Sequence, residues 1–211
     1  MTEPPYLLAA RTSYNAVADD YADFARLRFA KDVAGRALLG AFAELAPGPI
    51  ADVGCGPGHV TAHLAGLGAE VSGIDLSPRM IALARGSYPG LRFEVGSMTA
   101  LDLPDARLGG VLAWWSIFHM PPRVLPVVFA EFHRVLMPGG QVLLGFHVGD
   151  EVLRPESAYG RHVSYEAHLL RPERVAELLG MAGFKLTARM DLPGAKRPQA
   201  CLLARKPGGD E

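Results

Sequence analysis

Apolar positions along the chain alternate between helical and strand-like spacing, which predicts an α/β fold. Short apolar runs typical of buried strands are separated by longer segments in which apolar residues recur every three or four positions. The strands are predicted over residues 50–53, 69–74, 91–95, 109–115, 141–148, 185–192 and 199–205. The helices are predicted over residues 11–25, 29–46, 59–66, 77–86, 122–136 and 171–184, the 122–136 helix being closed by "MPGG".

The order of these elements predicts a mostly parallel sheet. A strand that is followed by a helix and a second strand forms a right-handed crossover, which places helices on both faces of the sheet. The connection "PGAKRP" between the last two strands is too short for such a crossover, so these strands are predicted to form an antiparallel hairpin. Ligands of such sheets bind beyond the carboxyl ends of the central strands.

Glycines gather at one of those carboxyl ends, in the stretch "ADVGCGPGHV". Glycine adds no side chain to a core, and a glycine loop before a helix lets a ligand approach bare backbone. Gly54, Gly56 and Gly58 have the spacing G-x-G-x-G, which differs from the G-x-G-x-x-G of dinucleotide-binding loops. The loop therefore predicts a ligand other than a dinucleotide.

Two aspartates accompany the loop. Asp52 precedes the first glycine and is placed to attract an ammonium group, directly or through water. Asp75 ends the second strand, where an acid can accept hydrogen bonds from both hydroxyls of a ribose. Together they indicate a nucleoside with a positively charged tail.

Four segments in order resemble motifs of the class I S-adenosylmethionine-dependent methyltransferases: "ADVGCGPG", "GIDLSPRMIALAR", "GSMTALDLPD" and "VLMPGGQVLL". The resemblance extends from about residue 14 to residue 206. It implies a Rossmann-like seven-stranded sheet in the order 3-2-1-4-5-7-6, with strand 7 antiparallel and an N-terminal helical lid. It also implies S-adenosylmethionine as methyl donor, S-adenosylhomocysteine as product, and a small-molecule acceptor.

The same resemblance implies which residues contact the donor. The three glycines would surround its methionine part near Asp52, Asp75 would hold the ribose, and Leu76 and Met80 would lie against the adenine. At the adenine edge, Ser97 stands where many relatives carry an acid, and Cys55 is interpreted as a small packing residue. The predicted cofactor-binding residues are Tyr14, Tyr21, Asp52, Gly54, Cys55, Gly56, Gly58, Asp75, Leu76, Met80, Gly96, Ser97, Met98, Trp115 and Ser116.

Aromatic residues at two places favour a small acceptor. Tyr14 and Tyr21 lie on one side of an N-terminal helix, which either packs on the sheet or covers the donor as a lid. Trp114, Trp115 and Ser116 end the fourth strand in "WWSI". This differs from the Asn- or Asp-Pro-Pro-Tyr that is usual in methyltransferases of DNA bases and protein glutamines.

Two histidines are candidates for a general base. His119 follows the fourth strand and His147 ends the fifth, so both are expected on the ligand side of the sheet, although a structural role is the alternative for each. His162 and His168 fall in the irregular segment that is expected to wall the acceptor pocket. No metal is expected, because acids such as Asp150 are scattered among turns.

Composition limits the remaining choices. The 211 residues carry a formal net charge of −1, which offers no basic field for nucleic acid and no polybasic face for a membrane. Two cysteines and no readable secretory signal predict a reduced, cytoplasmic protein. We expect a single domain in three parts: a lid segment over 1–47, a donor-binding domain over 48–206 and a disordered tail over 207–211. The oligomeric state stays open.

Three functions compete at this stage. The first is a small-molecule methyltransferase whose acceptor atom could be oxygen, nitrogen, sulfur or carbon. The second is an NAD(P)-dependent oxidoreductase on a Rossmann sheet, against which the glycine spacing and the antiparallel closing strand argue. The third is a methyltransferase-like protein that binds the donor without turnover.

Overall fold

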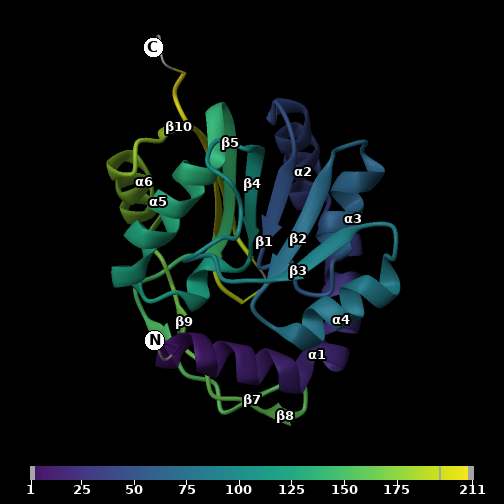
Figure 1. Cartoon of the computed structure of the whole chain (residues 1–211). Helices are drawn as coiled ribbons and strands as arrows, with labels where there is room; N and C mark the ends of the chain where they lie inside the picture. Colours follow the sequence, from purple (N-terminus) through teal and green to yellow (C-terminus); the bar gives the residue numbers. More distant parts are fainter. Residues whose placement is uncertain (1–2, 195, 209–211) are drawn as a thin grey trace.

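Seven strands form one mixed sheet in the order β3-β2-β1-β4-β5-β11-β10 (Figure 1). The structure is a computed structural model that describes residues 3–194 and 196–208. The strands are β1 (Ile50–Val53), β2 (Val71–Asp75), β3 (Arg92–Val95), β4 (Leu108–Trp114), β5 (Leu136–His147), β10 (Lys185–Leu192) and β11 (Gln199–Arg205). Strands β1 to β5 pair in parallel, and β11 is antiparallel to both of its neighbours. The predicted sheet order and its antiparallel seventh strand are confirmed.

Helices cover both faces of this sheet (Figure 1). They are α2 (Val33–Leu45), α3 (His59–Gly66), α4 (Pro78–Ser87), α5 (Leu125–Val135) and α6 (Pro172–Met181), with short 3-10 helices η1 (Ile117–His119) and η2 (Pro122–Val124). Successive residues of a strand point to opposite faces. Accordingly Val142 and Leu144 join the core cluster of α5 and α6, while Leu143 joins the cluster of α2 and α3. Both faces of the central strands are therefore buried.

Helix α2 belongs to one of these covering layers. Its Leu39 and Phe42 are fully buried in the same cluster as Ile50 and Leu112 of the sheet. Within the expected lid over 1–47, α2 therefore covers a face of the sheet, and a lid over the ligand side stays a prediction for α1. The expected tail falls partly on residues 209–211, which lie outside the described part of the chain.

Helix α1 (Pro5–Lys31) is longer than the predicted helix over 11–25 and crosses the carboxyl ends of the strands (Figure 1). Asn15 of α1 accepts hydrogen bonds from the Ser77 hydroxyl at 2.6 Å and from the Arg79 backbone N–H at 3.2 Å. Asp19 forms an ion pair with Arg79 at 2.8 Å. These contacts fix α1 to the start of α4, which Ser77 caps by accepting the Met80 N–H.

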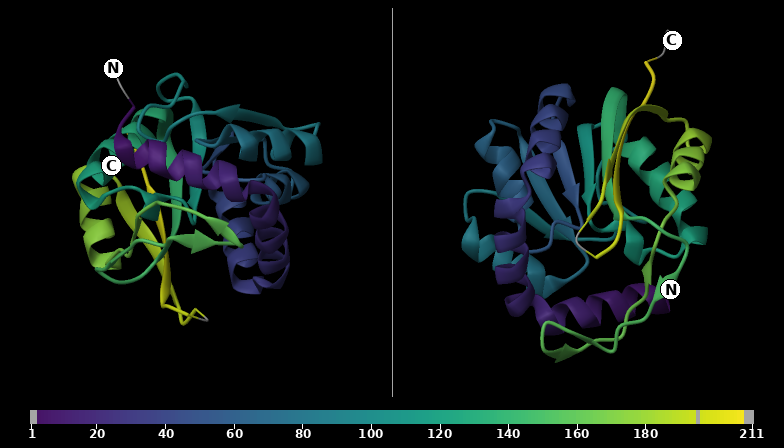
Figure 2. Two further views of the ribbon diagram at one scale, coloured as in Figure 1. Left: turned by 90° about the horizontal axis from the view of Figure 1, so that it is seen from below. Right: turned by 180° about the vertical axis from the view of Figure 1, so that it is seen from behind.

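The irregular segment after β5 wraps the outer side of α1 (Figure 2). It contains four two-residue strands, β6 (Val152–Leu153) paired with β9 (Ala167–His168), and β7 (Ser157–Ala158) paired with β8 (Arg161–His162). Arg161 forms an ion pair with Asp20 of α1 at 3.1 Å. The Ser164 backbone N–H donates to the Ser13 hydroxyl at 3.0 Å. Helix α1 is therefore held between this segment and the sheet.

The predicted helix over 122–136 is wrong at both ends. A 3-10 turn precedes α5, and the helix stops at Val135. The Pro-Gly-Gly stretch then belongs to β5, because Gly139 donates its N–H to the Lys206 carbonyl at 2.9 Å and Gly140 accepts from the Lys206 N–H at 2.8 Å. Backbone pairing with Lys206 thus makes this stretch part of β5.

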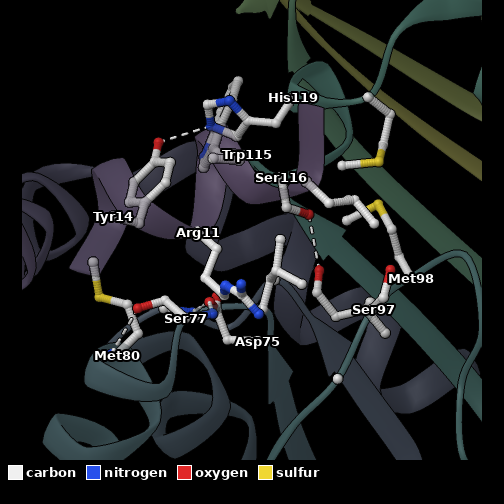
Figure 3. A pocket seen from close by; sticks show the side chains of 18 of the residues that line it. Arg11, Tyr14, Asp75, Ser77, Met80, Ser97, Met98, Trp115, Ser116 and His119 are labelled. Atoms are coloured by element: carbon white, nitrogen blue, oxygen red, sulfur yellow. Dashed lines mark hydrogen bonds between the residues drawn. The ribbon is translucent and has the colours of Figure 1, made fainter. Parts of the chain in front are cut away.

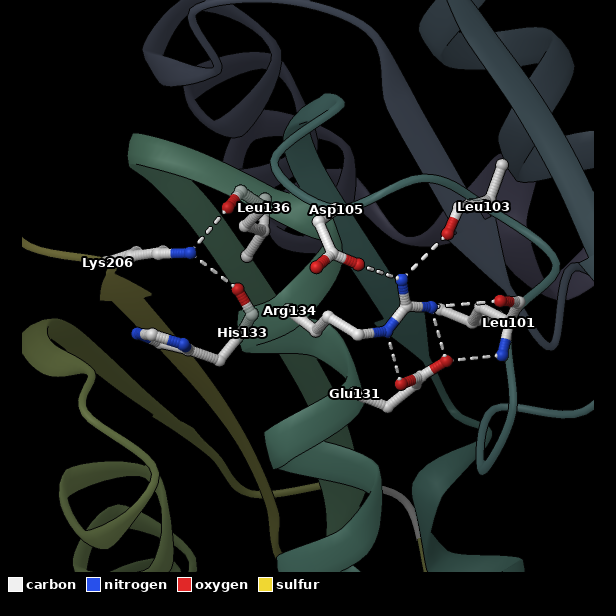
Figure 4. A network of polar contacts seen from close by, with 8 residues as sticks. All are labelled: Leu101, Leu103, Asp105, Glu131, His133, Arg134, Leu136 and Lys206. Atoms are coloured by element: carbon white, nitrogen blue, oxygen red, sulfur yellow. Dashed lines mark hydrogen bonds and ion pairs between the residues drawn. The ribbon is translucent and has the colours of Figure 1, made fainter.

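Arg134 at the end of α5 fastens the loop between β3 and β4 (Figure 4). Its guanidinium donates to the Leu101 carbonyl at 3.0 Å, the Leu103 carbonyl at 2.8 Å and the Asp105 carboxylate at 2.6 Å. Glu131 bridges the same groups, since it accepts from Arg134 at 2.7 Å and from the Leu101 N–H at 2.6 Å. The network fixes the loop whose first residues reach the ligand side of the sheet.

Candidate active site

Two adjoining cavities lie between α1 and the carboxyl ends of the strands. The first has about 670 Å³ and the second about 1470 Å³, both counted with space open to solvent. The first is lined by Leu7, Ala10, Arg11, Tyr14, Tyr21, Val53, Gly54, Gly56, Asp75, Leu76, Ser77, Met80, Gly96, Ser97, Met98, Trp115, Ser116, His119 and Met120. Tyr14, Tyr21 and Trp115 line both cavities and form their common boundary.

The glycine loop that follows β1 forms one wall of the first cavity. Gly54 and Gly56 have φ angles of 81° and 54°, which favour glycine. A side chain at Gly54 would collide with Ser116, and one at Gly58 would lie 2.7 Å from the Phe93 ring. At Gly56 the nearest atom is a carbon of Tyr21 at 3.6 Å. Gly56 is thus the glycine that leaves its backbone open to a ligand.

Asp75 holds this loop in shape from the end of β2. Its carboxylate accepts the Gly56 N–H and the Ser77 N–H, each at 2.8 Å. Burial raises the pKa of Asp75, although the two backbone hydrogen bonds oppose the shift. Each oxygen accepts one of these bonds and keeps a free lone pair, so the carboxylate can also accept hydrogen bonds from a ligand.

Three of the residues predicted to bind the donor do not line either cavity. Asp52 is 1% exposed and accepts a hydrogen bond from the Thr61 hydroxyl at 2.7 Å, behind the loop. Burial raises the pKa of Asp52 to about 7. Cys55 packs with Ile81 and Phe93, and Gly58 also faces that cluster. Their place is beneath the loop, where they support its shape.

The opposite part of the first cavity is apolar. Leu76 and Met80 come from the start of α4, and Gly96, Ser97 and Met98 come from the loop after β3. The Ser97 hydroxyl is hydrogen-bonded to the Thr99 hydroxyl at 2.8 Å. Figure 3 shows Met80 on one side of this cavity and Ser97 and Met98 on the other.

Six residues that line the first cavity were not predicted from the sequence: Leu7, Ala10, Arg11, Val53, Ser77 and Met120. Three of them come from the first turns of α1, and the predicted helix over 11–25 left out two of these, Leu7 and Ala10. The helix begins with proline at its first position, a common start signal, so the "EPPY" stretch could have revealed the longer helix. Arg11 forms an ion pair with Glu3 at 2.7 Å.

Trp115 stands at the boundary in an uncommon backbone conformation. Its φ angle is 57°, in the left-handed region that bulky residues rarely adopt. The surroundings hold this conformation, because the Trp115 N–H donates to the Gly145 carbonyl at 3.0 Å and the Ser116 hydroxyl donates to the Val53 carbonyl at 2.8 Å. Such strain is concentrated at binding sites in proteins.

His119 forms a hydrogen-bonded pair with Tyr14 across the site (Figure 3). The Tyr14 oxygen lies 2.7 Å from Nε2 of His119, and Nδ1 of His119 lies 3.4 Å from the Glu166 carbonyl. Burial raises the pKa of Tyr14 and lowers the pKa of His119 to about 4. The imidazole is therefore neutral at pH 7, with Nδ1–H facing the carbonyl and Nε2 accepting the tyrosine hydroxyl.

The two candidate bases lie in different cavities. His119 lines the first, while His147 lines the second and lies against Trp115 with ring centroids 5.4 Å apart. Burial lowers the pKa of His147 to about 4, helped by the positive charges of Arg28 and Arg197. His162 and His168 line neither cavity, although their neighbours Tyr165 and Ala167 line the second.

Within 3–194 and 196–208, no group of three or more His, Cys, Asp or Glu side chains could hold a metal ion. Over the same residues, no helix combines the length and the apolar composition needed to cross a membrane.

Comparisons with known proteins agree with this geometry. Residues 50–140 match the family described as "Methyltransferase domain". The chain is 32% identical over 166 residues to O-methyltransferase cnsE of Penicillium expansum, which covers 74% of this chain and 59% of that protein. It is 39% identical over 92 residues to demethylmenaquinone methyltransferase of Chlorobaculum parvum, which covers 43% of this chain and 37% of that protein. The chain thus spans less than two thirds of either relative.

Solved structures share the fold over 76% to 98% of the chain. The crystal structure of Burkholderia thailandensis 1,6-didemethyltoxoflavin-N1-methyltransferase, with bound 1,6-didemethyltoxoflavin and S-adenosylhomocysteine, has a TM-score of 0.75 at 24% identity. The match covers 98% of this chain and 92% of that chain. A methyltransferase of Methanosarcina mazei matches with a TM-score of 0.69 at 20% identity, over 76% of this chain and 92% of that chain.

Proposed function

Because residues 50–140 belong to the methyltransferase-domain family and the sheet has the class I strand order, we propose that this protein transfers a methyl group from S-adenosylmethionine to a small-molecule acceptor. One observation carries the proposal. The Asp75 carboxylate and the open backbone at Gly56 lie together in a cavity that adjoins a second, larger cavity. A nucleoside site beside a separate space suits a reaction with two substrates.

The first cavity fits S-adenosylmethionine by the chemistry of its lining. Asp75 supplies the lone pairs that ribose hydroxyls need, Leu76 and Met80 supply apolar walls for the adenine, and Gly56 supplies an approach without a side chain. We propose these as donor-binding residues, with Ser97 and Met98 at the adenine edge.

When bound, S-adenosylmethionine supplies a methyl group that is already activated on a sulfonium. The chain must then align the acceptor and exclude water. Tyr14, Tyr21 and Trp115 are suited to both tasks, since they stand between the two cavities and are held by α1 and β4. We propose the second cavity as the acceptor site.

His119 is our proposed general base. Its imidazole is unprotonated at neutral pH, so Nε2 is free of a proton, and the lowered pKa makes it a weaker base than an exposed histidine. Since the Tyr14 hydroxyl occupies that nitrogen, the proton of an acceptor hydroxyl or amine would pass to the Tyr14 oxygen while the Tyr14 proton passes to Nε2. His147 is the alternative base, because it lies on the far side of Trp115 within the acceptor cavity.

Titration with the donor tests the proposal. Calorimetry should show binding of S-adenosylmethionine and S-adenosylhomocysteine but not of NADH. Incubation with methyl-labelled donor and a set of small molecules should transfer the label. Binding of NADH alone would favour the oxidoreductase, and donor binding without transfer to any acceptor would favour the non-catalytic protein.

Replacement of each histidine separates the two candidate bases. Loss of a general base lowers the rate by about 10²–10⁴-fold. We expect His119→Ala to lose turnover on that scale with donor affinity kept, Tyr14→Phe to lose part of it, and His147→Ala to be milder. Full turnover in both histidine variants would mean that alignment alone sustains the reaction.

A further inference from the structure

The second cavity has walls suited to a flat ring. Its lining includes nine Phe, Tyr and Trp side chains, from α1, from the end of β4, from η1 and from the segment after β5. They are Tyr14, Tyr21, Phe24, Phe29, Trp114, Trp115, Phe118, Tyr159 and Tyr165. Aromatic side chains bind other rings by offset stacking and by edge-to-face contact. The walls therefore favour a planar aromatic ligand over a flexible aliphatic one.

One of these aromatic residues, Trp115, is in contact with a positively charged side chain. The Arg28 guanidinium lies over the Trp115 ring, 5.3 Å from its centroid. The His147 ring lies against the same indole at 5.4 Å with a tilt of 33°. The left-handed backbone at Trp115 is what brings the indole to this place at the end of β4. An arginine that stacks by its face keeps its N–H edges available for an anion.

The charged groups of this cavity are three arginines and one aspartate: Arg28, Arg154, Arg197 and Asp32. Arg154 is satisfied by an ion pair with Glu166 at 2.8 Å, and Asp32 accepts the Gly35 N–H at 2.9 Å as the cap of α2. Within residues 3–194 and 196–208, no ion pair or hydrogen bond engages the guanidinium of Arg28 or Arg197.

These two arginines come from distant parts of the chain but line the same cavity. Arg28 belongs to α1 and Arg197 to the connection between β10 and β11, and the charges of both reach His147. Because His147 and His59 are themselves neutral at pH 7, the uncompensated charge of the cavity is positive. Two unpaired guanidiniums that line the same aromatic cavity supply charge-assisted hydrogen-bond donors for an anion such as a carboxylate.

We propose that the second cavity binds a planar aromatic carboxylate, with its ring against Trp115 and its anionic group between Arg28 and Arg197. The inference names the acceptor class and so rests on the proposed methyl transfer. The group to be methylated then lies at the other end of the ring, toward the boundary formed by Tyr14 and Tyr21.

Acid and amide pairs of identical shape test this assignment in the full chain. The probes are benzoate with benzamide, hydroxybenzoate isomers with their amides, and naphthoate with naphthamide. Phenyl phosphate is added to distinguish a carboxylate site from a general anion site. Both tryptophans of the chain line the cavity, so the quenching of intrinsic fluorescence reports binding. The titrations are made with and without saturating S-adenosylhomocysteine.

We expect the acids to bind at least about tenfold more tightly than their amides, the scale of a hydrogen bond to a charged group. Arg28→Gln and Arg197→Gln should each remove most of that difference. Arg26→Gln is the matched control, because Arg26 lies on the same helix, exposed and paired with Asp23 at 3.4 Å. It should keep the full preference.

Equal affinity of acid and amide, failure of every acid to bind at millimolar concentration, or the same loss in Arg26→Gln would overturn the inference. Stronger binding of phenyl phosphate than of all carboxylates would overturn the choice of carboxylate. Binding of S-adenosylhomocysteine in the same samples distinguishes failure of the acceptor class from failure of the proposed function. If it binds and the acids show no preference, only the acceptor class is wrong, whereas failure of S-adenosylhomocysteine to bind refutes the proposed function.

Discussion

At the scale of the residue, a single carboxylate shapes the first cavity. Asp75 accepts the N–H groups of Gly56 and Ser77, so it joins the glycine loop to the start of α4. These two hydrogen bonds fix the backbone conformation in which Gly56 faces the cavity. Asp75 therefore contributes to the cavity through its geometry as well as through its charge.

Asp75→Asn should weaken donor binding with little loss of fold. The amide keeps one acceptor oxygen but turns an NH₂ toward a backbone donor, and hydrogen bonds to a charged group are worth about 1.5–3 kcal/mol. We expect the affinity for S-adenosylhomocysteine, measured by calorimetry, to fall by that amount. Asp102→Asn, at an exposed position, is the control. An unchanged affinity in Asp75→Asn would remove Asp75 from the donor site.

At the scale of the element, α1 is a cover fixed at several separate points. Asn15 and Asp19 hold it to α4, and Ser13 and Asp20 hold it to the segment after β5. The Tyr159 ring of the β7–β8 turn adds an edge contact with Tyr21 at 5.3 Å. Both cavities are closed on this side by the helix.

Removal of residues 1–31 should open both cavities and leave the sheet folded. The new chain would start at Asp32, which still caps α2 through the Gly35 N–H, and the Leu39 and Phe42 core would remain. We expect a folded circular dichroism spectrum, a large loss of donor affinity and more solvent-exposed tryptophan fluorescence. Donor affinity equal to that of the full chain would show that α1 is packing only.

The hydrogen-bond network around Arg134 connects α5 to the loop between β3 and β4. Arg134→Met keeps the aliphatic length but removes the guanidinium that donates to the Leu101 and Leu103 carbonyls, and it leaves the Glu131 carboxylate with the Leu101 N–H alone. We expect the free energy of unfolding in urea to fall by about 1–3 kcal/mol, the cost of unsatisfied groups. Arg92→Ala, at an exposed position, should change it little. Equal stability of the two variants would contradict a structural role for the network.

At the scale of the whole molecule, buried and half-buried histidines make stability depend on pH. The pKa values of His59, His119 and His147 are each lowered to about 4 by burial, so the unfolded chain binds protons below pH 6.5 that the folded chain does not. Their stabilising contribution is complete above that pH and is lost as the pH falls toward 4. Asp52 acts in the opposite direction, because its raised pKa favours the folded state in acid. Asp75, whose pKa is also raised, adds to this opposing effect.

The histidines outnumber the opposing aspartates, so acid should destabilise the protein. His63, His133 and His168 also have lowered pKa values and add to the effect. We expect the free energy of unfolding in urea to be lower at pH 5 than at pH 7, by at least about 1.4 kcal/mol per pH unit. This slope corresponds to one more proton bound by the unfolded chain than by the folded chain. His119→Gln should reduce the slope, and His162→Gln, at an exposed position, should not. Stability that is constant or rises toward pH 5 would contradict this balance.

The order of the sheet strands and of the helices that cover them could be predicted from the sequence, whereas the ends of α1 and the short strands β6 to β9 could not. Strand and helix periodicities depend on neighbours two to four positions apart, and the short link before β11 permits only an antiparallel return. The same local logic placed Gly56, Asp75, Met80 and Ser97 beside one cavity, because loops after parallel strands meet at one edge of a sheet.

Which side chains at this edge line a cavity and which support the glycine loop depends on the tertiary structure. Gly54 is required by Ser116, and Asp52 turns away from the cavity to bind Thr61. Tyr14 meets His119 across 105 residues, and Arg28 of α1 lies over Trp115. No spacing along the chain encodes such contacts, since they depend on the angle at which α1 crosses the sheet and on the strained turn at Trp115. The local pattern therefore placed a site at this edge, and long-range packing divided it into two cavities.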